Sequence, residues 1–271
     1  MQLDAPGKMS FLARKAYFVV RRPRLDRDKA NVLQEYSDGW SQYRAHLAQA
    51  RTLDDWLRIR GVEDQPDYYN VDGALSYEAF DSAGYYRRML LDALRRYFPQ
   101  ARSVTEFGAG VGRNVLFLKR EAPDWDTYGY ELCTPGVEVA QAAAEKFHLE
   151  ARYAQLDYLN DPPAKYVFPV TDVAYTMFSL EQLPRENQLA VRNMLDHVRL
   201  GTLHIEPVPE NYPYTLRGLL GRVDHWKVDY LSGFDRAVRG LALQQVIVER
   251  LASAHNPLMF PSLYVLKKQQ S

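Results

Sequence analysis

The chain has 271 residues, which suits one large domain or one domain with an N-terminal extension. Its 34 basic and 34 acidic residues balance, so we expect no nucleic-acid partner held by bulk charge. The single cysteine, Cys133, forms no internal disulfide, and no apolar run reaches the roughly 18 residues of a membrane span. These features favour a cytoplasmic protein.

Residues 1–75 are predicted to form a basic, helical extension that caps the rest of the chain. Within it, residues 8–29 are strongly basic, with Asp26 and Asp28 as the only acids. This segment fits a solvated face, contact with an anionic membrane surface, or contact with an anionic substrate. A membrane contact would make the protein peripheral at the inner membrane face.

Two helices are predicted before the glycine-rich part of the chain. Residues 31–60 repeat aromatic and aliphatic side chains at steps of three and four, the period of an amphipathic helix. Residues 61–76 are rich in turn-forming residues and are predicted to be a loop. A second helix is predicted from an N-cap at Ser76 to Phe98. Tyr77, one of several aromatics there, is a candidate for binding a sugar ring, although packing would explain these aromatics equally well.

The stretch from Val104 to Arg113 is the most informative part of the chain. It places Gly108, Gly110 and Gly112 at every second position, between a short β-type run and a helical pattern. Glycines let the backbone approach a ligand closely, and the start of the next helix offers free N–H groups to an anion. The dinucleotide fingerprint would need glycine at position 113, so a nicotinamide-dependent oxidoreductase is the weaker interpretation.

Later segments predict an alternation of strands and helices. Glu131 ends a predicted strand, where a carboxylate can accept hydrogen bonds from ribose hydroxyls, and a helix is predicted over 135–147. The last two strands are joined by a short connection and are expected to form a hairpin. The predicted strands after the glycine-rich turn are residues 127–131, 151–157, 170–178, 201–206, 241–250 and 259–267.

The pattern Glu-x-Gly-x-Gly-x-Gly at residues 106–112, followed by Glu131 and Asp157, resembles motif I and the acidic positions of class I S-adenosylmethionine (SAM)-dependent methyltransferases. The resemblance covers about residues 100–268. It implies SAM as cofactor and an α/β, Rossmann-like, seven-stranded, mainly parallel sheet with an antiparallel terminal hairpin, in a domain of residues 76–271. In that family, the acid matching Asp157 contacts the adenine amino group. The implied cofactor-binding residues are Glu106, Gly108, Gly110, Gly112, Glu131, Asp157 and Phe178.

Methyl transfer needs alignment of the acceptor, and a hydroxyl acceptor must also lose its proton. A His, Asp or Glu near the strand ends is therefore expected. Glu181 and Gln182, which follow the strand at 170–178, are candidates for catalysis and substrate binding, although Glu181 would also serve as a helix cap. Glu206, at the end of the strand 201–206, is a second catalytic candidate.

The long insertion at residues 207–240 is interpreted as a lid. It contains His225, our first candidate for a catalytic base, and Trp226, a candidate substrate contact; an exposed loop histidine is the alternative. A divalent ion near Asp172, Glu206 or Asp224 has no supporting ligand spacing, so we expect no metal.

We predict a SAM-dependent methyltransferase that O-methylates a sugar, a glycan or another small polar hydroxyl compound. The segment 178–182 and the turn 256–258 resemble bacterial methyltransferases near polysaccharide and natural-product pathways. The alternatives are N-methylation of a small amine, amino acid or peptide side chain, and, in another class, a non-catalytic SAM-binding partner or sensor. The family's Asn-Pro-Pro-Tyr motif of nucleobase and glutamine methylation is absent from the sequence.

Overall fold

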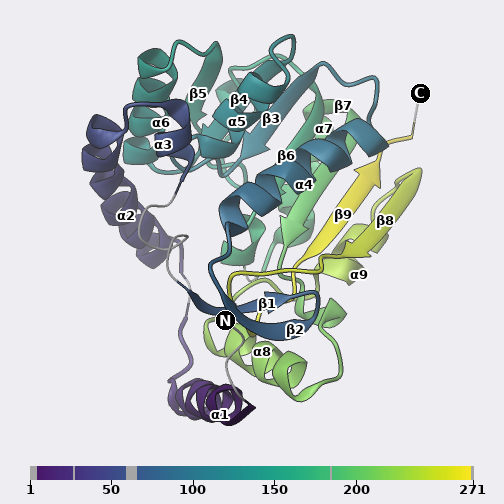
Figure 1. Cartoon of the computed structure of the whole chain (residues 1–271). Helices are drawn as coiled ribbons and strands as arrows, with labels where there is room; N and C mark the ends of the chain where they lie inside the picture. Colours follow the sequence, from purple (N-terminus) through teal and green to yellow (C-terminus); the bar gives the residue numbers. More distant parts are fainter. Residues whose placement is uncertain (1–4, 27, 59–65, 184, 270–271) are drawn as a thin grey trace.

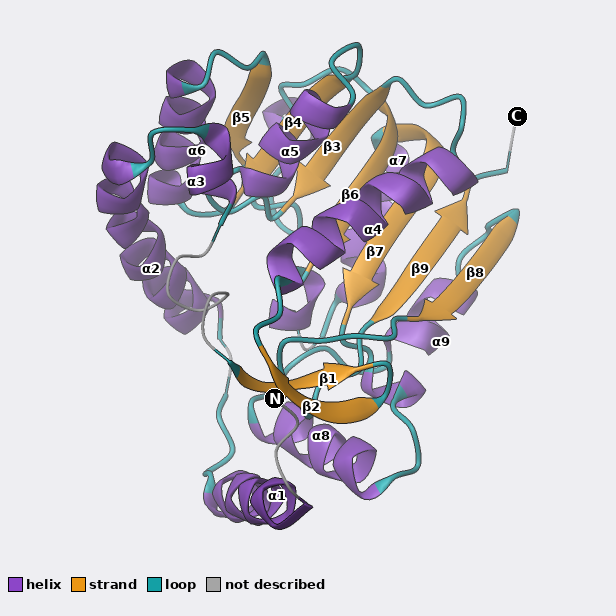
Figure 2. Ribbon diagram, in the orientation of Figure 1, coloured by secondary structure: helices purple, strands orange, loops and turns teal. Residues whose placement is uncertain are grey.

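The computed structural model describes residues 5–26, 28–58, 66–183 and 185–269. Seven strands form one sheet, shown in Figures 1 and 2. The strands are β3 (Ser103–Phe107), β4 (Asp126–Glu131), β5 (Ala151–Gln155), β6 (Thr171–Met177), β7 (Val198–Glu206), β8 (Gln245–Arg250) and β9 (Ser262–Lys267). Their order is β5-β4-β3-β6-β7-β9-β8, and β9 runs antiparallel to both of its neighbours. This confirms the predicted sheet and its terminal hairpin.

Helices cover both faces of this sheet (Figure 2). One hydrophobic core includes the inner sides of α4, α5 and α6, and a second includes those of α7 and α9. Along β6, Val173 and Tyr175 belong to the first core and Ala174 to the second, as the two-residue period of a strand requires. These helices are α4 (Ser82–Tyr97), α5 (Arg113–Glu121), α6 (Thr134–Lys146), α7 (Asn187–Asp196) and α9 (Phe234–Arg239).

The N-terminal part contributes α1 (Ala5–Arg21), α2 (Lys29–Gln49) and α3 (Leu53–Leu57). The helix predicted over 31–60 is therefore two helices, and its last two positions lie outside the described residues. The break is stabilised at Thr52, whose hydroxyl accepts the N–H of Asp55 while the Asp55 carboxylate accepts the N–H of Thr52. α2 packs along α6 at the β5 side of the molecule (Figure 1).

The loop predicted over 61–76 is wrong from residue 67 onward; residues 61–65 lie outside the described part. Here β1 (Asp67–Val71) and β2 (Ala74–Glu78) form an antiparallel hairpin, which turns through Asp72 and Gly73 at φ of 50° and 75°. Such left-handed pairs suit two-residue hairpin turns. Because β2 continues past Ser76, that residue caps no helix. α4 begins later, and Asp81 is its N-cap, accepting the N–H of Gly84 at 2.7 Å.

The insertion at 207–240 is mostly ordered into helices. It contains a short 3-10 turn, η3 (Pro209–Asn211), followed by α8 (Leu216–Lys227) and α9. α8 packs against α1 at the end of the molecule beyond the β1–β2 hairpin (Figure 1). In the part of the chain that the structure describes, no helix has both the length and the apolar character needed to cross a membrane.

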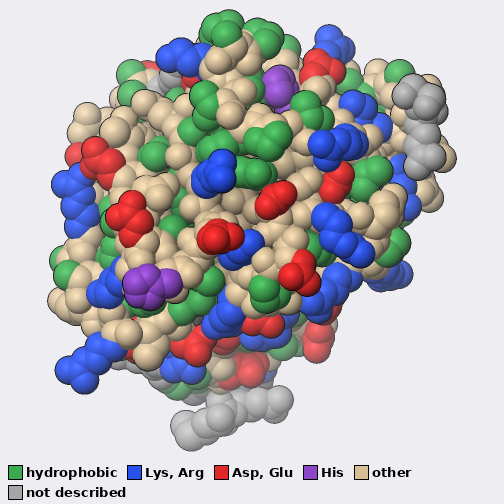
Figure 3. Space-filling model, turned by 90° about the horizontal axis from the view of Figure 1, so that it is seen from above, with side chains coloured by type: hydrophobic (Ala, Val, Ile, Leu, Met, Phe, Trp, Pro, Cys, Tyr) green, Lys and Arg blue, Asp and Glu red, His purple; other side chains and the backbone are tan. Residues whose placement is uncertain are grey.

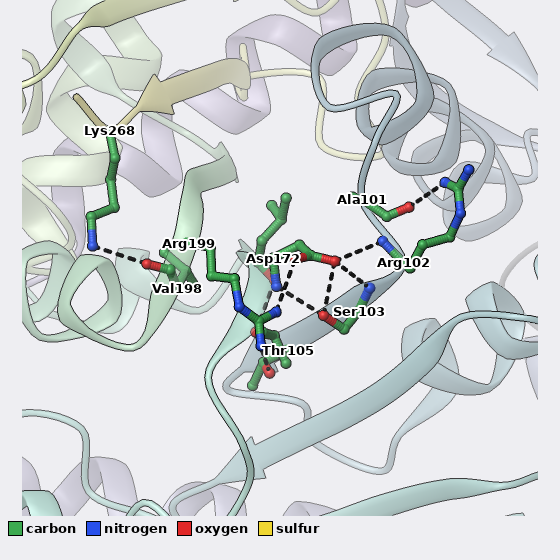
Figure 4. Close-up of polar contacts among 10 residues, drawn as sticks. Ala101, Arg102, Ser103, Thr105, Asp172, Val198, Arg199 and Lys268 are labelled. Carbon is green, nitrogen blue, oxygen red and sulfur yellow. Dashed lines mark hydrogen bonds and ion pairs between the residues drawn. The ribbon is translucent and has the colours of Figure 1, made fainter. Parts of the chain in front are cut away.

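Asp172 links three segments of the chain at the edge of the sheet where the parallel strands begin (Figure 4). Its carboxylate accepts the N–H groups of Arg102 and Ser103, at 2.8 and 3.0 Å, and pairs with Arg199 at 2.9 Å. Partial burial raises the pKa of Asp172, but these hydrogen bonds outweigh it and hold the pKa below its usual value. Figure 3, which views this edge of the molecule, shows acidic and basic side chains intermixed over the surface.

Candidate functional site

A cavity of about 430 Å³ opens at the carboxyl ends of β3, β4, β5 and β6. β3 lies between β4 and β6. The strands that follow β3 in the chain are added first on one side of it, as β4 and β5, and then on the other side, beginning with β6. Ligands of open α/β sheets bind at such a switch point, beyond the carboxyl ends of the strands. The walls come from α2, α4, the loops after these four strands, and the β8–β9 connection.

The glycine turn after β3 forms one wall of this cavity. Gly108 and Gly110 line it with positive φ angles of 78° and 53°. A Cβ at Gly110 would lie 3.0 Å from the Trp40 ring, so the turn is packed closely beneath α2. Gly112, with φ of 78°, lies on the protein side of the turn, where a Cβ would come 2.7 Å from the Tyr153 ring. The turn therefore needs glycine at each of these positions.

Two of the predicted acids reach the same cavity. Glu131, at the end of β4, is buried and accepts the N–H groups of Gly110 and Cys133, at 2.8 and 3.0 Å. Burial raises its pKa, and those hydrogen bonds oppose the rise. Asp157, after β5, also lines the cavity and accepts the N–H of Leu159 at 3.1 Å. The carboxylates from the two strand ends thus face one space.

Glu106, also predicted to bind cofactor, lies beneath the turn and contacts protein. Asn114 donates to its Oε1 at 2.7 Å, and the Tyr175 hydroxyl donates to its Oε2 at 3.3 Å. Complete burial raises the pKa of Glu106 to about 8. Its place between β3 and the start of α5 indicates that it stabilises the turn from below.

The loop after β6 forms the part of the cavity wall next to the glycine turn. Phe178, at φ of 54°, lines the cavity with its ring edge-on to Tyr86 of α4, at a centroid distance of 4.8 Å. Glu181 and Gln182 line it as well, and the Gln182 amide donates to the Glu181 carboxylate at 3.0 Å. His255 reaches this wall from the β8–β9 connection, 6.2 Å from the Phe178 ring.

Glu206 holds this loop in place from inside the protein. It is fully buried, and its carboxylate accepts three consecutive backbone N–H groups: Ser179 and Leu180 at 3.1 Å and Glu181 at 3.2 Å. Burial raises its pKa to about 7 against the effect of these hydrogen bonds. Glu206 is therefore placed to position Glu181 and not to touch the contents of the cavity.

The other three candidates lie away from this cavity wall. His225 is buried on the inner side of α8, where its Nε2–H donates to the Leu231 carbonyl at 2.7 Å, and burial lowers its pKa to about 4. Trp226 is exposed on α8 beside the Arg24 guanidinium, 5.0 Å from the ring centroid. Tyr77 lies in the β1–β2 hairpin with its ring tilted by 59° against that of Tyr68, at a centroid distance of 5.1 Å.

The sequence predicted an N-terminal helical cap, but three residues of α2 and α4 that line the cavity were not named as site residues. Tyr36 and Trp40 of α2 and Arg87 of α4 line the cavity. The four-residue spacing of Tyr36 and Trp40 indicated a helix but could not show what its face covers. Arg113, where the dinucleotide fingerprint has glycine, lies 4.8 Å from the Tyr43 ring and therefore joins the start of α5 to α2.

No protein-family model matches the chain, and no curated protein sequence matches it. Solved structures do match. Magnesium protoporphyrin IX methyltransferase (ChlM) from Synechocystis PCC 6803 with bound SAH superposes with a TM-score of 0.59 at 10% identity, over 89% of this chain and 100% of that one. The [4+2]-cyclase SpnF gives 0.61 at 13% identity, over 93% and 100%. Phosphoethanolamine N-methyltransferase 2 from Haemonchus contortus gives 0.50 at 12%, over 68% and 53%.

These likenesses extend over most of the chain at low identity, so they establish the architecture. The sheet order, the glycine turn and the acids at successive strand ends agree with them. The chain therefore has the class I SAM-dependent methyltransferase fold.

Proposed function

We propose that the protein is a SAM-dependent methyltransferase that O-methylates a small polar hydroxyl compound, such as a sugar. The supporting observation is one cavity lined both by the glycine turn, Glu131 and Asp157 and by Glu181 and Gln182. We call the first of these two groups of residues the first wall, which would bind the cofactor. The second group is the second, or acceptor, wall, which would bind the acceptor.

The first wall fits SAM. Glu131 offers a buried carboxylate to ribose hydroxyls, Asp157 offers one to the adenine amino group, and Gly108 and Gly110 leave room where a side chain would intrude. When bound, SAM supplies a methyl group activated by its sulfonium. Trp40 and Tyr36 of α2 would cover the cofactor and exclude water from it.

The second wall fits a hydroxyl acceptor. Glu181 is the one of our three catalytic candidates that lines the cavity, and its carboxylate would accept the acceptor's proton. Gln182 would orient neighbouring hydroxyls, and the rings of Phe178 and Tyr86 would support the apolar face of a sugar. His255 is a second proton acceptor on the same wall.

One observation favours the N-methylation alternative. Aromatic rings beside a carboxylate, here Tyr86 and Phe178 beside Glu181, also suit a cationic amine before it loses its proton. One matching structure is named as an N-methyltransferase in complex with phosphomonomethylethanolamine, and another is named as a cyclase. The same fold therefore supports several reactions, and the residues that contact the acceptor determine which reaction occurs.

Calorimetric titration with SAM and S-adenosylhomocysteine tests the cofactor half. We expect micromolar binding, weakened at least about tenfold by Glu131→Gln, since a buried hydrogen-bonded charge is worth about 1.5–3 kcal/mol. Glu150→Gln, an exposed carboxylate between α6 and β5, is the matched control and should leave binding unchanged. Absence of binding to either ligand would refute the methyltransferase proposal.

Transfer assays on panels of sugars, polyols and amines test the acceptor half. S-adenosylhomocysteine should form with hydroxyl compounds, and Glu181→Gln should lower kcat by about 100-fold or more, the usual contribution of a general base. Product from amines alone would favour N-methylation. Cofactor binding without transfer to any acceptor in either panel would favour a SAM-binding partner or sensor.

A further inference from the structure

α8 turns its large apolar side chains toward solvent. Leu216, Leu219, Val223 and Trp226 recur at steps of three, four and three, so they lie on one face of the helix. All four are exposed, from 40% for Val223 to 66% for Leu216. Tyr214, just before the helix, is 90% exposed. This outward stripe is unlike the usual surface helix, whose apolar face is buried.

The inner face of α8 explains this orientation. It carries Gly218, Gly221 and His225, which are buried. A Cβ on either glycine would overlap a backbone carbonyl oxygen, that of Pro213 or of Leu258. The helix thus packs closely at Gly218 and Gly221, where a larger side chain has no room.

α1 extends the same surface. It packs against α8, and the segment just after α1 is joined to α8 by the Arg22–Asp224 ion pair at 2.9 Å and by a hydrogen bond from Leu25 N–H to the Lys227 carbonyl. Figures 1 and 2 show them side by side at the end of the molecule beyond the hairpin. The exposed large apolar side chains of α1 are Met9, Tyr17, Phe18 and Val20. These exposed apolar side chains on two helices that pack together are here named the α1–α8 surface.

The charge around this surface is positive, although the whole chain is neutral. α1 contains Lys8, Arg14, Lys15 and Arg21 and no acid. α8 contains three basic residues and one acid, and that acid, Asp224, is already paired with Arg22. An occupant of the α1–α8 surface should therefore be apolar at its centre and negative around it.

We propose that the α1–α8 surface docks on an anionic lipid membrane. Aliphatic and Trp side chains flanked by arginines and lysines are the composition of interfacial helices, whose apolar face enters the headgroup region while the cations meet anionic lipids. A second copy of this chain would bring the same positive charges together, so charge complementarity favours the lipid surface.

Docking would hold the cavity at a fixed place relative to the membrane. His225 of α8 donates to the Leu231 carbonyl at 2.7 Å, and the Leu231 N–H donates to the Glu181 carbonyl at 3.0 Å. The helix that carries the apolar stripe is thus linked to the loop that forms the acceptor wall. The docking proposal itself does not depend on methyl transfer.

Vesicle flotation of the full chain tests the proposal. We expect binding to phosphatidylcholine vesicles that contain phosphatidylglycerol, little binding to pure phosphatidylcholine, and weaker binding as salt rises. Arg14→Glu with Arg21→Glu should weaken the partition coefficient by about 25-fold or more, because each basic residue at such a surface contributes about fivefold. Leu216→Ser with Leu219→Ser should also weaken it strongly.

Matched controls keep the result specific. Val167→Ser with Val170→Ser alters two valines that are also exposed, at 66% and 46%, and Arg192→Glu reverses an exposed charge on α7. These should bind vesicles like the wild type. Absence of flotation with anionic vesicles, equal binding to neutral ones, or equal losses in the control variants would overturn the proposal. Dimerisation that Leu216→Ser with Leu219→Ser abolishes, without vesicle binding, would instead assign the surface to a second copy.

Discussion

Gly108→Ala should damage the site through one specific contact. The residue has φ of 78°, and an added Cβ would overlap the Ser179 Oγ and lie 2.6 Å from the Ser179 Cβ. Rotation of the hydroxyl relieves the first overlap but not the second. The left-handed backbone costs about 1–2 kcal/mol for alanine, and overpacking costs about 1–3 kcal/mol. We therefore expect a loss of about 2–5 kcal/mol in unfolding free energy and weaker SAM binding.

A double-mutant cycle with Ser179→Gly separates these two costs. After that change, the Ser179 Cα position, at 3.8 Å, would be the nearest remaining contact of the three, which is ordinary packing. Gly108→Ala should then cost only its backbone part, about 1–2 kcal/mol. Gly73→Ala, at φ of 75° with nothing within 4 Å of the added Cβ, measures that part alone. Urea unfolding and SAM titration provide both readouts. An equal cost of Gly108→Ala in both backgrounds would refute the contact between the two loops.

Two further predictions concern carboxylates. Asp172→Asn should lower the unfolding free energy by about 1–2 kcal/mol at pH 7, whereas Asp126→Asn at the same edge should not. The pKa of Asp172 is lower in the folded than in the unfolded state. Its contribution to the unfolding free energy is therefore present above the unfolded-state pKa and disappears as pH falls through the folded-state pKa. Urea unfolding of the wild type and of Asp172→Asn at pH 7 and pH 3 checks this. Glu206, with its pKa raised to about 7, should make the wild type lose stability as pH rises from about 4.5 to 7. Glu206→Gln should remove that loss of unfolding free energy, which amounts to up to about 3 kcal/mol. If the unfolding free energy of Glu206→Gln depended on pH as that of the wild type does, this prediction would be wrong.

The sequence predicted those parts of the fold whose signals are local. Strand β4 and helix α6 begin and end within a residue or two of the predicted positions. The turn at Gly108–Gly112 was recognisable because only glycine tolerates its positive φ angles and close neighbours. Glu131 could be placed because it ends a predicted strand, where a carboxylate can reach ribose hydroxyls, whereas Asp157 was placed by its match to an acidic position of the resembling family.

The errors arose where a signal was overlooked or was not local. Asp72-Gly73 between two short runs that contain Tyr68, Tyr69 and Tyr77 is a hairpin signal, and it outweighs the N-cap preference of Ser76. No helix was predicted within the insertion at 207–240, and an apolar stripe there would have had the same period whether it faced the core or solvent. His225 therefore seemed a possible base in a lid, yet it is buried. His255 lies in a connection without any periodic pattern and reaches the cavity only through the tertiary fold.

The acids of the site differ in whether they line the cavity or lie beneath its loops, and the two positions have different consequences for pH. Asp157 and Glu181 line the cavity, whereas Glu106 and Glu206 lie beneath the loops and have pKa values raised to about 8 and 7. A proton gained or lost by Glu206 changes how well three backbone N–H groups of the acceptor wall are held. Turnover near neutral pH should therefore respond to the order of that loop as well as to the base that touches the acceptor. A pH midpoint near 7 that persists in Glu181→Gln and disappears in Glu206→Gln would assign it to the loop, and the reverse would assign it to Glu181.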